Sequence, residues 1–178
     1  MRWEVFKQDT PKKAHQAVGS VHGADAEHAL LNARHVFGRR PAAVSMWVVR
    51  ADRIYSRTAE ELAAESSAGA DGTDTPPATG TGPRTYLVFR KSSHRRSMTF
   101  VEHVGEVEAS HPRDALVSAM SRSADGEGLA WWVIEEGDVH RSDPDAAESW
   151  FEPALDKTYK QQSQYGTVAP GAGKRSAS

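Results

Sequence analysis

Cysteine is absent from the 178 residues of this chain. Its absence excludes disulfide bonds, thiolate nucleophiles, iron–sulfur clusters and cysteine-ligated zinc, so any redox chemistry must belong to a partner protein. The sequence also has neither an apolar run long enough to span a bilayer nor an apolar signal segment after Met1. We therefore expect a cytoplasmic protein that binds no membrane.

An excess of charge of one sign is also missing. The 22 basic and 24 acidic residues leave a formal net charge of -2, so the whole-chain charge does not favour nucleic acid as a partner. One local basic cluster consists of Arg90, Lys91, Arg95 and Arg96. Because no aromatic platform is interleaved with it, we interpret it as a solvated turn between two strands.

The motifs of the common enzyme classes are missing as well. The sequence has no glycine-rich phosphate loop, nucleophile elbow or kinase signature. A carboxylate-bridged di-iron site needs Glu-x-x-His on two helices and a Glu from each of two more, whereas this chain has that spacing once, at Glu108 and His111. We therefore expect no catalytic residue, no bound cofactor and no metal site in this chain.

What the sequence does contain is an internal repeat. Four blocks recur in the same order further along the chain, which chance rarely produces. The paired blocks are Trp3–Phe6 with Tyr86–Phe89, Val18–Val21 with Val104–Val107, Ala29–Leu30 with Ala115–Leu116, and Trp47–Val49 with Trp132–Ile134. We interpret the repeat as a tandem duplication of one small unit.

The duplication divides the chain into four parts. The first unit covers residues 1–62, and a diverged second unit with an aromatic C-terminal arm covers residues 84–168. Residues 63–83 have no hydrophobic periodicity and almost no large apolar side chain, which predicts a flexible linker. Residues 169–178 consist mainly of Gly, Ala, Ser and charged residues, which predicts a disordered tail.

Hydrophobic patterning predicts the same elements in both units. The expected strands are 3–8, 17–22 and 44–49 in the first unit and 86–90, 99–108 and 129–134 in the second. Asp25 and Gly38 bound a helix in the first unit, Ser110 caps one in the second, and residues 51–54 are expected to form a closing turn. The predicted fold class is α+β, with two tandem β-β-α-β units whose antiparallel sheets pack as a pseudo-dimer.

Histidine and aromatic residues are the candidate partner contacts. His15 and His22 lie on or beside the second predicted strand, where a histidine contacts a partner, remains an ordinary surface residue, or acts as an acid or base near neutral pH. Phe151, Tyr159 and Tyr165 belong to a C-terminal stretch with little regular periodicity. Such a stretch is typical of an arm lying in a groove of another subunit, and equally of a tail folded over its own sheet.

The first unit and the C-terminal stretch together resemble the PaaB family, which provides one of the subunits of the bacterial ring 1,2-phenylacetyl-CoA epoxidases. The matching residues occur in the family's order. They are Trp3–Phe6, His15, Val18–His22, Ala24–Ala26, Ala29–Leu30, Asn32–Arg34, Arg39–Arg40, Val44–Val49, Ala51, Ile54, Phe151–Ala154, Asp156–Lys157 and Tyr159. The chain departs from the family because a linker and a second unit precede the aromatic stretch.

This resemblance implies a non-catalytic, bridging subunit of a multicomponent oxygenase in aerobic phenylacetate degradation. The implied partners are a catalytic di-iron subunit, the structural subunit paired with it and, indirectly, a flavin and iron–sulfur reductase. Arg34, Arg39 and Arg40 match the family, and exposed charges add little to stability but matter at interfaces. We therefore expect these arginines to contact the partner.

Two other functions are compatible with the sequence. The first is a stand-alone enzyme or binding protein of the small α+β barrel type that acts on a small aromatic ligand. Such a protein would bind or convert its ligand when purified alone. The second is a scaffolding module that works without an oxygenase.

Overall fold

The chain forms helices and one antiparallel sheet, which confirms the α+β class. The computed structural model describes residues 1–38, 43–68, 82–93, 101–122 and 128–154. In chain order the elements are β1 (Arg2–Gln8), β2 (Gln16–His22), α1 (Ala26–Phe37), β3 (Ser45–Arg50), η1 (Ala51–Arg53), β4 (Tyr55–Thr58), α2 (Ala59–Ala68), β5 (Arg84–Lys91), β6 (Glu102–Ala109), α3 (Pro112–Arg122), β7 (Ala130–Glu135), η2 (Glu136–Asp138), β8 (His140–Arg141), α4 (Ala147–Phe151) and η3 (Glu152–Ala154). Within the described ranges, no helix is both long enough and apolar enough to cross a membrane.

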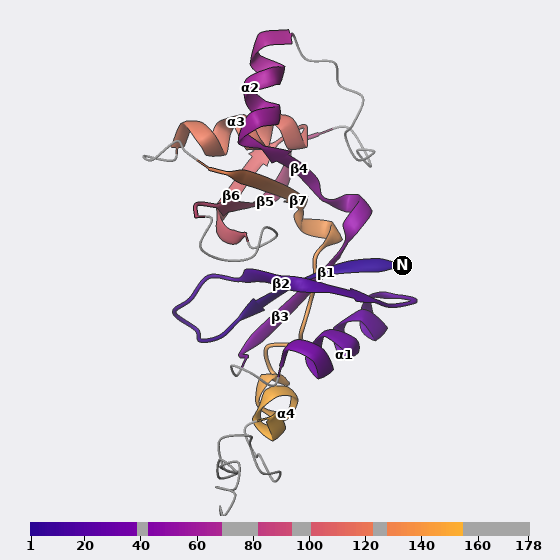
Figure 1. The fold of residues 1–178 in the computed structure, drawn as a ribbon. Helices are drawn as coiled ribbons and strands as arrows, with labels where there is room; N and C mark the ends of the chain where they lie inside the picture. Colours follow the sequence, from indigo (N-terminus) through magenta and orange to yellow (C-terminus); the bar gives the residue numbers. More distant parts are fainter. Residues whose placement is uncertain (39–42, 69–81, 94–100, 123–127, 155–178) are drawn as a thin grey trace, which may run out of the picture.

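The strands belong to two stacked layers. The sheet order is β4-β7-β5-β6-β2-β1-β3-β8. We call β2-β1-β3-β8 the lower half-sheet and β6-β5-β7-β4 the upper half-sheet. They lie one above the other in Figure 1, with α2 and α3 above the upper half-sheet and α1 and α4 below the lower one. Residues 1–68, the first half of the chain, and residues 82–154, the second half, follow the same order of strands and helices.

Each half-sheet is completed by a strand from the other half of the chain. β4 pairs with β7, where Tyr55 faces Val133, and β8 pairs with β3, where Arg141 faces Trp47. The short helices η1 and η2 precede these exchanged strands. Neither half of the chain therefore builds its layer from its own strands alone.

Strand alternation sorts the buried side chains into three layers. Trp3 and Val5 of β1 pack in the core with α1, whereas Phe6 faces the space between the half-sheets. In β5, Val88 packs in the core with α3, whereas Phe89 faces the same central space. The central layer consists of Phe6, Ala17, Val49, Leu87, Phe89, Val101, Ile134 and Val139.

The backbone joins the two half-sheets along a short seam between β2 and β6. Gln16 faces Glu102 there. The Ala17 amide donates to the Val101 carbonyl oxygen at 2.8 Å, and the His103 amide donates to the His15 carbonyl oxygen at 2.9 Å. The central layer of side chains therefore contributes most of the contact between the half-sheets.

The helix of the first half begins and ends where the sequence predicts. The Asp25 carboxylate accepts a hydrogen bond from the His28 amide at 2.8 Å, which is an N-cap contact. At the other end the Gly38 amide donates to the Arg34 carbonyl oxygen at 2.9 Å. These contacts confirm Asp25 and Gly38 as the bounds of α1.

Two segments differ from the predicted elements. Residues 51–54 contain η1 and lead into β4, a strand whose short polar sequence carries no hydrophobic alternation. The first residues of the predicted linker are helical, since α2 continues to Ala68. Thr58 and Glu61 cap this helix with reciprocal hydrogen bonds, and Leu62 packs against the core beneath α3.

The basic cluster of the second half is only partly a surface feature. Lys91 is 5% exposed, and the Arg90 guanidinium lies 5.7 Å from the Trp131 ring centroid. The prediction of a solvated turn is therefore wrong for Lys91. Arg95, Arg96, the rest of the predicted linker (69–81) and the predicted tail (169–178) lie outside the described residues.

Candidate functional site

Polar and aromatic side chains from both halves of the chain gather beside the seam. His15 is 7% exposed, and its Nε2 lies 3.0 Å from the Ser45 Oγ. Its ring stacks on the Trp47 indole with a centroid distance of 3.5 Å. His103 lies edge-on to the same indole at 5.8 Å, and the Arg141 guanidinium is 5.2 Å from its centroid. Trp47 is therefore the common contact of this cluster.

Burial lowers the pKa of both histidines. The pKa of His15 falls from 6.5 to about 3, chiefly because burial disfavours the imidazolium and further because His103 and Arg141 would repel it. Burial also lowers the pKa of His103. The His103 Nε2 has no hydrogen-bond partner within the described ranges. His15 is therefore a neutral ring at physiological pH.

The cluster is suited to holding the halves together. Ser45 lies within hydrogen-bond reach of His15, as a nucleophile and its base would. An imidazole with a pKa of about 3 is nevertheless too weak a base to remove the serine proton at neutral pH. The His15 ring contacts Ser45 and Trp47 within the first half. Trp47 in turn contacts His103 and Arg141 of the second half, so the role of His15 in this cluster is structural.

His22 lies at the far end of β2, away from this cluster. Its side chain is exposed, while its backbone carbonyl oxygen accepts a hydrogen bond from the Asn32 Nδ2 at 2.9 Å. The structure therefore separates the two histidines that the sequence grouped together. His22 stays a predicted partner contact, whereas the ring of His15 is buried beneath other side chains of this chain.

A second group of contacts attaches α4 to α1. The Arg34 Nε donates to the Trp150 carbonyl oxygen at 2.7 Å, and the guanidinium carbon lies 5.5 Å from the Trp150 ring centroid. Phe151 is 4% exposed and packs in the core formed by β1, β3 and α1. Arg34 and Phe151, both predicted partner contacts, are thus used in folding the end of the second half onto the first.

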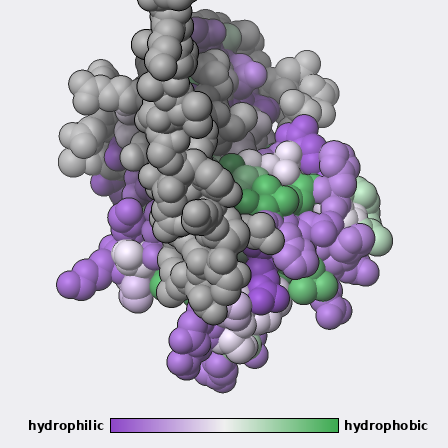
Figure 2. All heavy atoms as spheres, turned by 60° about the horizontal axis from the view of Figure 1, so that its bottom comes forward, coloured by the Kyte–Doolittle hydropathy of each residue, from purple (hydrophilic) through white to green (hydrophobic). Residues whose placement is uncertain are grey.

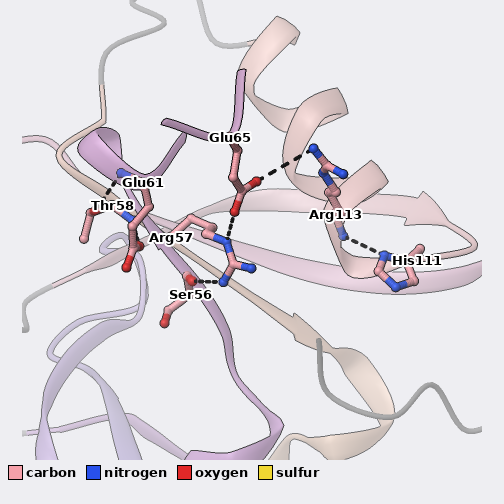
Figure 3. A network of polar contacts seen from close by, with 7 residues as sticks. All are labelled: Ser56, Arg57, Thr58, Glu61, Glu65, His111 and Arg113. Carbon is pink, nitrogen blue, oxygen red and sulfur yellow. Dashed lines mark hydrogen bonds and ion pairs between the residues drawn. The ribbon is translucent and has the colours of Figure 1, made fainter. Parts of the chain in front are cut away.

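A third group attaches α2 to α3 at the opposite end of the molecule, as Figure 3 shows. Glu65 of α2 forms ion pairs with the guanidinium groups of Arg57 at 2.5 Å and Arg113 at 3.8 Å. The Arg113 amide also donates to the His111 Nδ1 at 3.3 Å. The Arg57 guanidinium lies 4.4 Å from the Tyr55 ring centroid. This network fixes the end of the first half onto the second.

Sequence reasoning indicated Arg34 and Phe151 but not the other residues that make these attachments. Trp150, Glu65 and Arg113 are single residues whose partners lie far away in the chain, so no local spacing marks them. The predicted contacts Arg39, Arg40, Tyr159 and Tyr165 lie outside the described residues. In the part of the chain that the structure describes, no three His, Asp or Glu side chains gather as metal ligands would.

Comparisons with known proteins agree on one family. The model of the family described as "Phenylacetic acid degradation B" matches residues 1–71 and 84–170. The chain is 42% identical over 59 residues to a protein of Escherichia coli (strain K12) that is named as the B subunit of 1,2-phenylacetyl-CoA epoxidase. This alignment covers 33% of the chain and 62% of the relative's length. No solved structure matches the chain.

Proposed function

The chain belongs to the Phenylacetic acid degradation B family, and on this premise we propose that it is the non-catalytic, bridging subunit of a multicomponent di-iron oxygenase that acts in phenylacetate degradation. Its partners are the catalytic di-iron subunit and the structural subunit paired with it, and a flavin and iron–sulfur reductase supplies electrons indirectly. The observation that carries this proposal is the family match over both halves of the chain.

The packing of the interior supports a role without chemistry of its own. Phe6, Leu87, Phe89 and Ile134 are each 0% exposed and fill the space between the half-sheets. A small barrel enzyme would use such a space for its ligand. In the polar cluster, the low pKa of His15 likewise supports a role without acid–base chemistry at neutral pH.

We further propose that the chain is a fused pseudo-dimer of two tandem units. The contacts between corresponding positions of the two halves support this arrangement. Phe6 lies against Phe89 with a centroid distance of 4.4 Å, and Gln16 faces Glu102. The exchange of β4 and β8 is also reciprocal, as it is between subunits of a symmetric dimer.

Co-purification tests the function. The full chain, tagged and expressed together with the oxygenase subunits of its own genome, should elute with both subunits and with iron. The same chain expressed alone should carry no iron and should leave phenylacetyl-CoA unchanged. If the chain elutes alone, or if it converts or tightly binds a small aromatic ligand by itself, the stand-alone function replaces the accessory one.

A further inference from the structure

The molecule has two ends with corresponding elements but different exposed side chains. At one end α2 follows the exchanged strand β4 and packs beside α3, and at the other α4 follows the exchanged strand β8 and packs beside α1. We call them the α2–α3 end and the α1–α4 end. They lie at the top and the bottom of Figure 1.

At the α2–α3 end, ion pairs hold α2 against α3. Glu65 is shared between Arg57 and Arg113. Of the exposed charged side chains of α2 and α3, Glu60, Glu61 and Asp114 are acidic and Arg122 is basic, so this end carries charges of both signs. Leu62 of α2 is packed against the core beneath α3. One large apolar side chain of α3, Val117, is 59% exposed.

The α1–α4 end presents apolar and acidic side chains together. Val36 and Leu31 of α1 are 61% and 38% exposed. Figure 2 turns this end forward and shows hydrophobic residues at the surface among hydrophilic ones. Within residues 143–152, which include α4, the exposed charged side chains are all acidic, namely Asp143, Asp145, Glu148 and Glu152.

The charges of the described residues at this end indicate what can cover it, while Arg39 and Arg40, which follow α1, lie outside those residues. Arg34, a basic side chain of α1, is turned onto Trp150 by its hydrogen bond and its ring contact. A second copy of the chain would bring the same acidic row against itself, because a symmetric contact repeats one surface on both sides. Like charges in such a contact are repulsive. The complementary surface is therefore apolar with basic side chains at its rim.

We propose that the α1–α4 end is the surface through which this chain docks the oxygenase subunits, and that those subunits meet it with an apolar patch rimmed by lysine or arginine. This inference rests on the proposed function. Arg34 is a positioning residue of the surface, because it holds α4 in place beside the exposed face of α1. The α2–α3 end is left free in the complex.

A matched pair of valine variants tests the location of the surface. Val36→Asp and Val117→Asp each place a charge on an exposed helical position, one at each end. Val36→Asp should weaken capture of the oxygenase subunits at least about tenfold, because it buries a charge in an apolar contact, while Val117→Asp should leave capture unchanged. Equal loss in both variants, loss in Val117→Asp alone, or loss in neither would overturn the proposal.

A second pair tests the chemistry of the partner. Glu148 and Glu60 are exposed acids in the first turns of α4 and α2, so Glu148→Lys and Glu60→Lys make the same change at the two ends. Glu148→Lys should reduce the association rate with the subunits and its salt dependence, and Glu60→Lys should not. If Glu148→Lys leaves the association rate and its salt dependence unchanged, the partner does not meet this surface with basic side chains.

Failure of the proposed function has a different signature. If the wild-type chain captures no oxygenase subunit, the accessory role is lost and the docking surface is lost with it. If the wild type captures the subunits and the variants do not discriminate between the two ends, only the docking surface is wrong. Thermal unfolding of each variant alone separates loss of docking from loss of fold.

Discussion

The rings of Phe6 and Phe89 lie 4.4 Å apart, with an angle of 36° between their planes, in the central layer between the two half-sheets. Both side chains are 0% exposed. They occupy corresponding positions in β1 and β5 and face each other across the layer. The two halves of the chain therefore share one hydrophobic core in this layer.

Phe89→Ala should destabilise the whole molecule. Removing a fully buried ring costs about 3–5 kcal/mol in lost transfer free energy and cavity formation. Urea denaturation followed by tryptophan fluorescence and by far-UV circular dichroism measures the change. Because the halves share the core and exchange strands, both probes should report one transition at one midpoint. Two separated transitions would contradict a shared core.

Acid should destabilise the fold through His15. Its folded pKa of about 3 lies below its ordinary value of 6.5, so below pH 6.5 the unfolded chain binds a proton that the folded chain does not. The free energy of unfolding therefore decreases as the pH falls from 6.5 towards 3, by about 1.4 kcal/mol per pH unit at most. The lowered pKa of His103 acts in the same direction.

The variant His15→Gln isolates this contribution, because glutamine retains hydrogen-bonding capacity towards Ser45 but does not titrate. Its stability should depend less steeply on pH between 6.5 and 5 than that of the wild type. His35→Gln, at an exposed position of α1, is the control and should follow the wild-type curve. Equal slopes in all three proteins would show that His15 does not carry the effect.

Gly19 and Gly105 form a matched pair for backbone and packing effects. Both have positive φ, 141° and 155°, so alanine is strained at either position by about 1–2 kcal/mol. A Cβ at Gly19 would also meet the Phe37 Cζ at 2.9 Å, whereas a Cβ at Gly105 would meet nothing within 4 Å. Gly19→Ala should therefore be the more destabilising by about 1 kcal/mol or more, as thermal unfolding measures. Equal losses would mean that Phe37 moves freely.

Arg34→Ala should release α4 from α1. The variant loses the hydrogen bond to the Trp150 carbonyl oxygen and the contact with its ring, together worth about 1–2 kcal/mol. Hydrogen exchange should rise at residues 147–151 and remain unchanged at α2. Arg34→Lys keeps the charge but not the planar guanidinium, so it should restore protection only in part. Full protection in Arg34→Ala would show that Phe151 alone holds α4.

The elements whose signals are local were predictable. The strand at β1, the cap at Asp25 and the helix that follows depend on alternation, capping and periodicity within a few residues, and each lies within a residue or two of its expected place. The exchanged strands were not predictable in this way. β4 has four residues, and its register is set by Val133 and its neighbours, which lie far along the chain.

The same distinction between local and long-range signals applies to the candidate site. The sequence indicated Arg34 and Phe151 as residues of interest but not their roles, because these roles depend on what lies opposite them in the fold. Met46 and Trp131 occupy corresponding positions of β3 and β7. Met46 packs in one core together with Phe151 from α4, whereas the larger Trp131 occupies the equivalent place in the core beneath α3. The added volume of Phe151 thus compensates for the smaller Met46, and neither strand shows this compensation in its own sequence.

The exchange of β4 and β8 has a consequence for synthesis on the ribosome. When the first half emerges, β3 has no neighbour at its outer edge, and the amide of Met46 awaits the hydroxyl of Ser142. The strand and the helix that complete this layer, β8 and α4, are translated well after β3. Until the second half arrives, the newly made first half therefore exposes an unpaired strand edge, and such an edge favours aggregation.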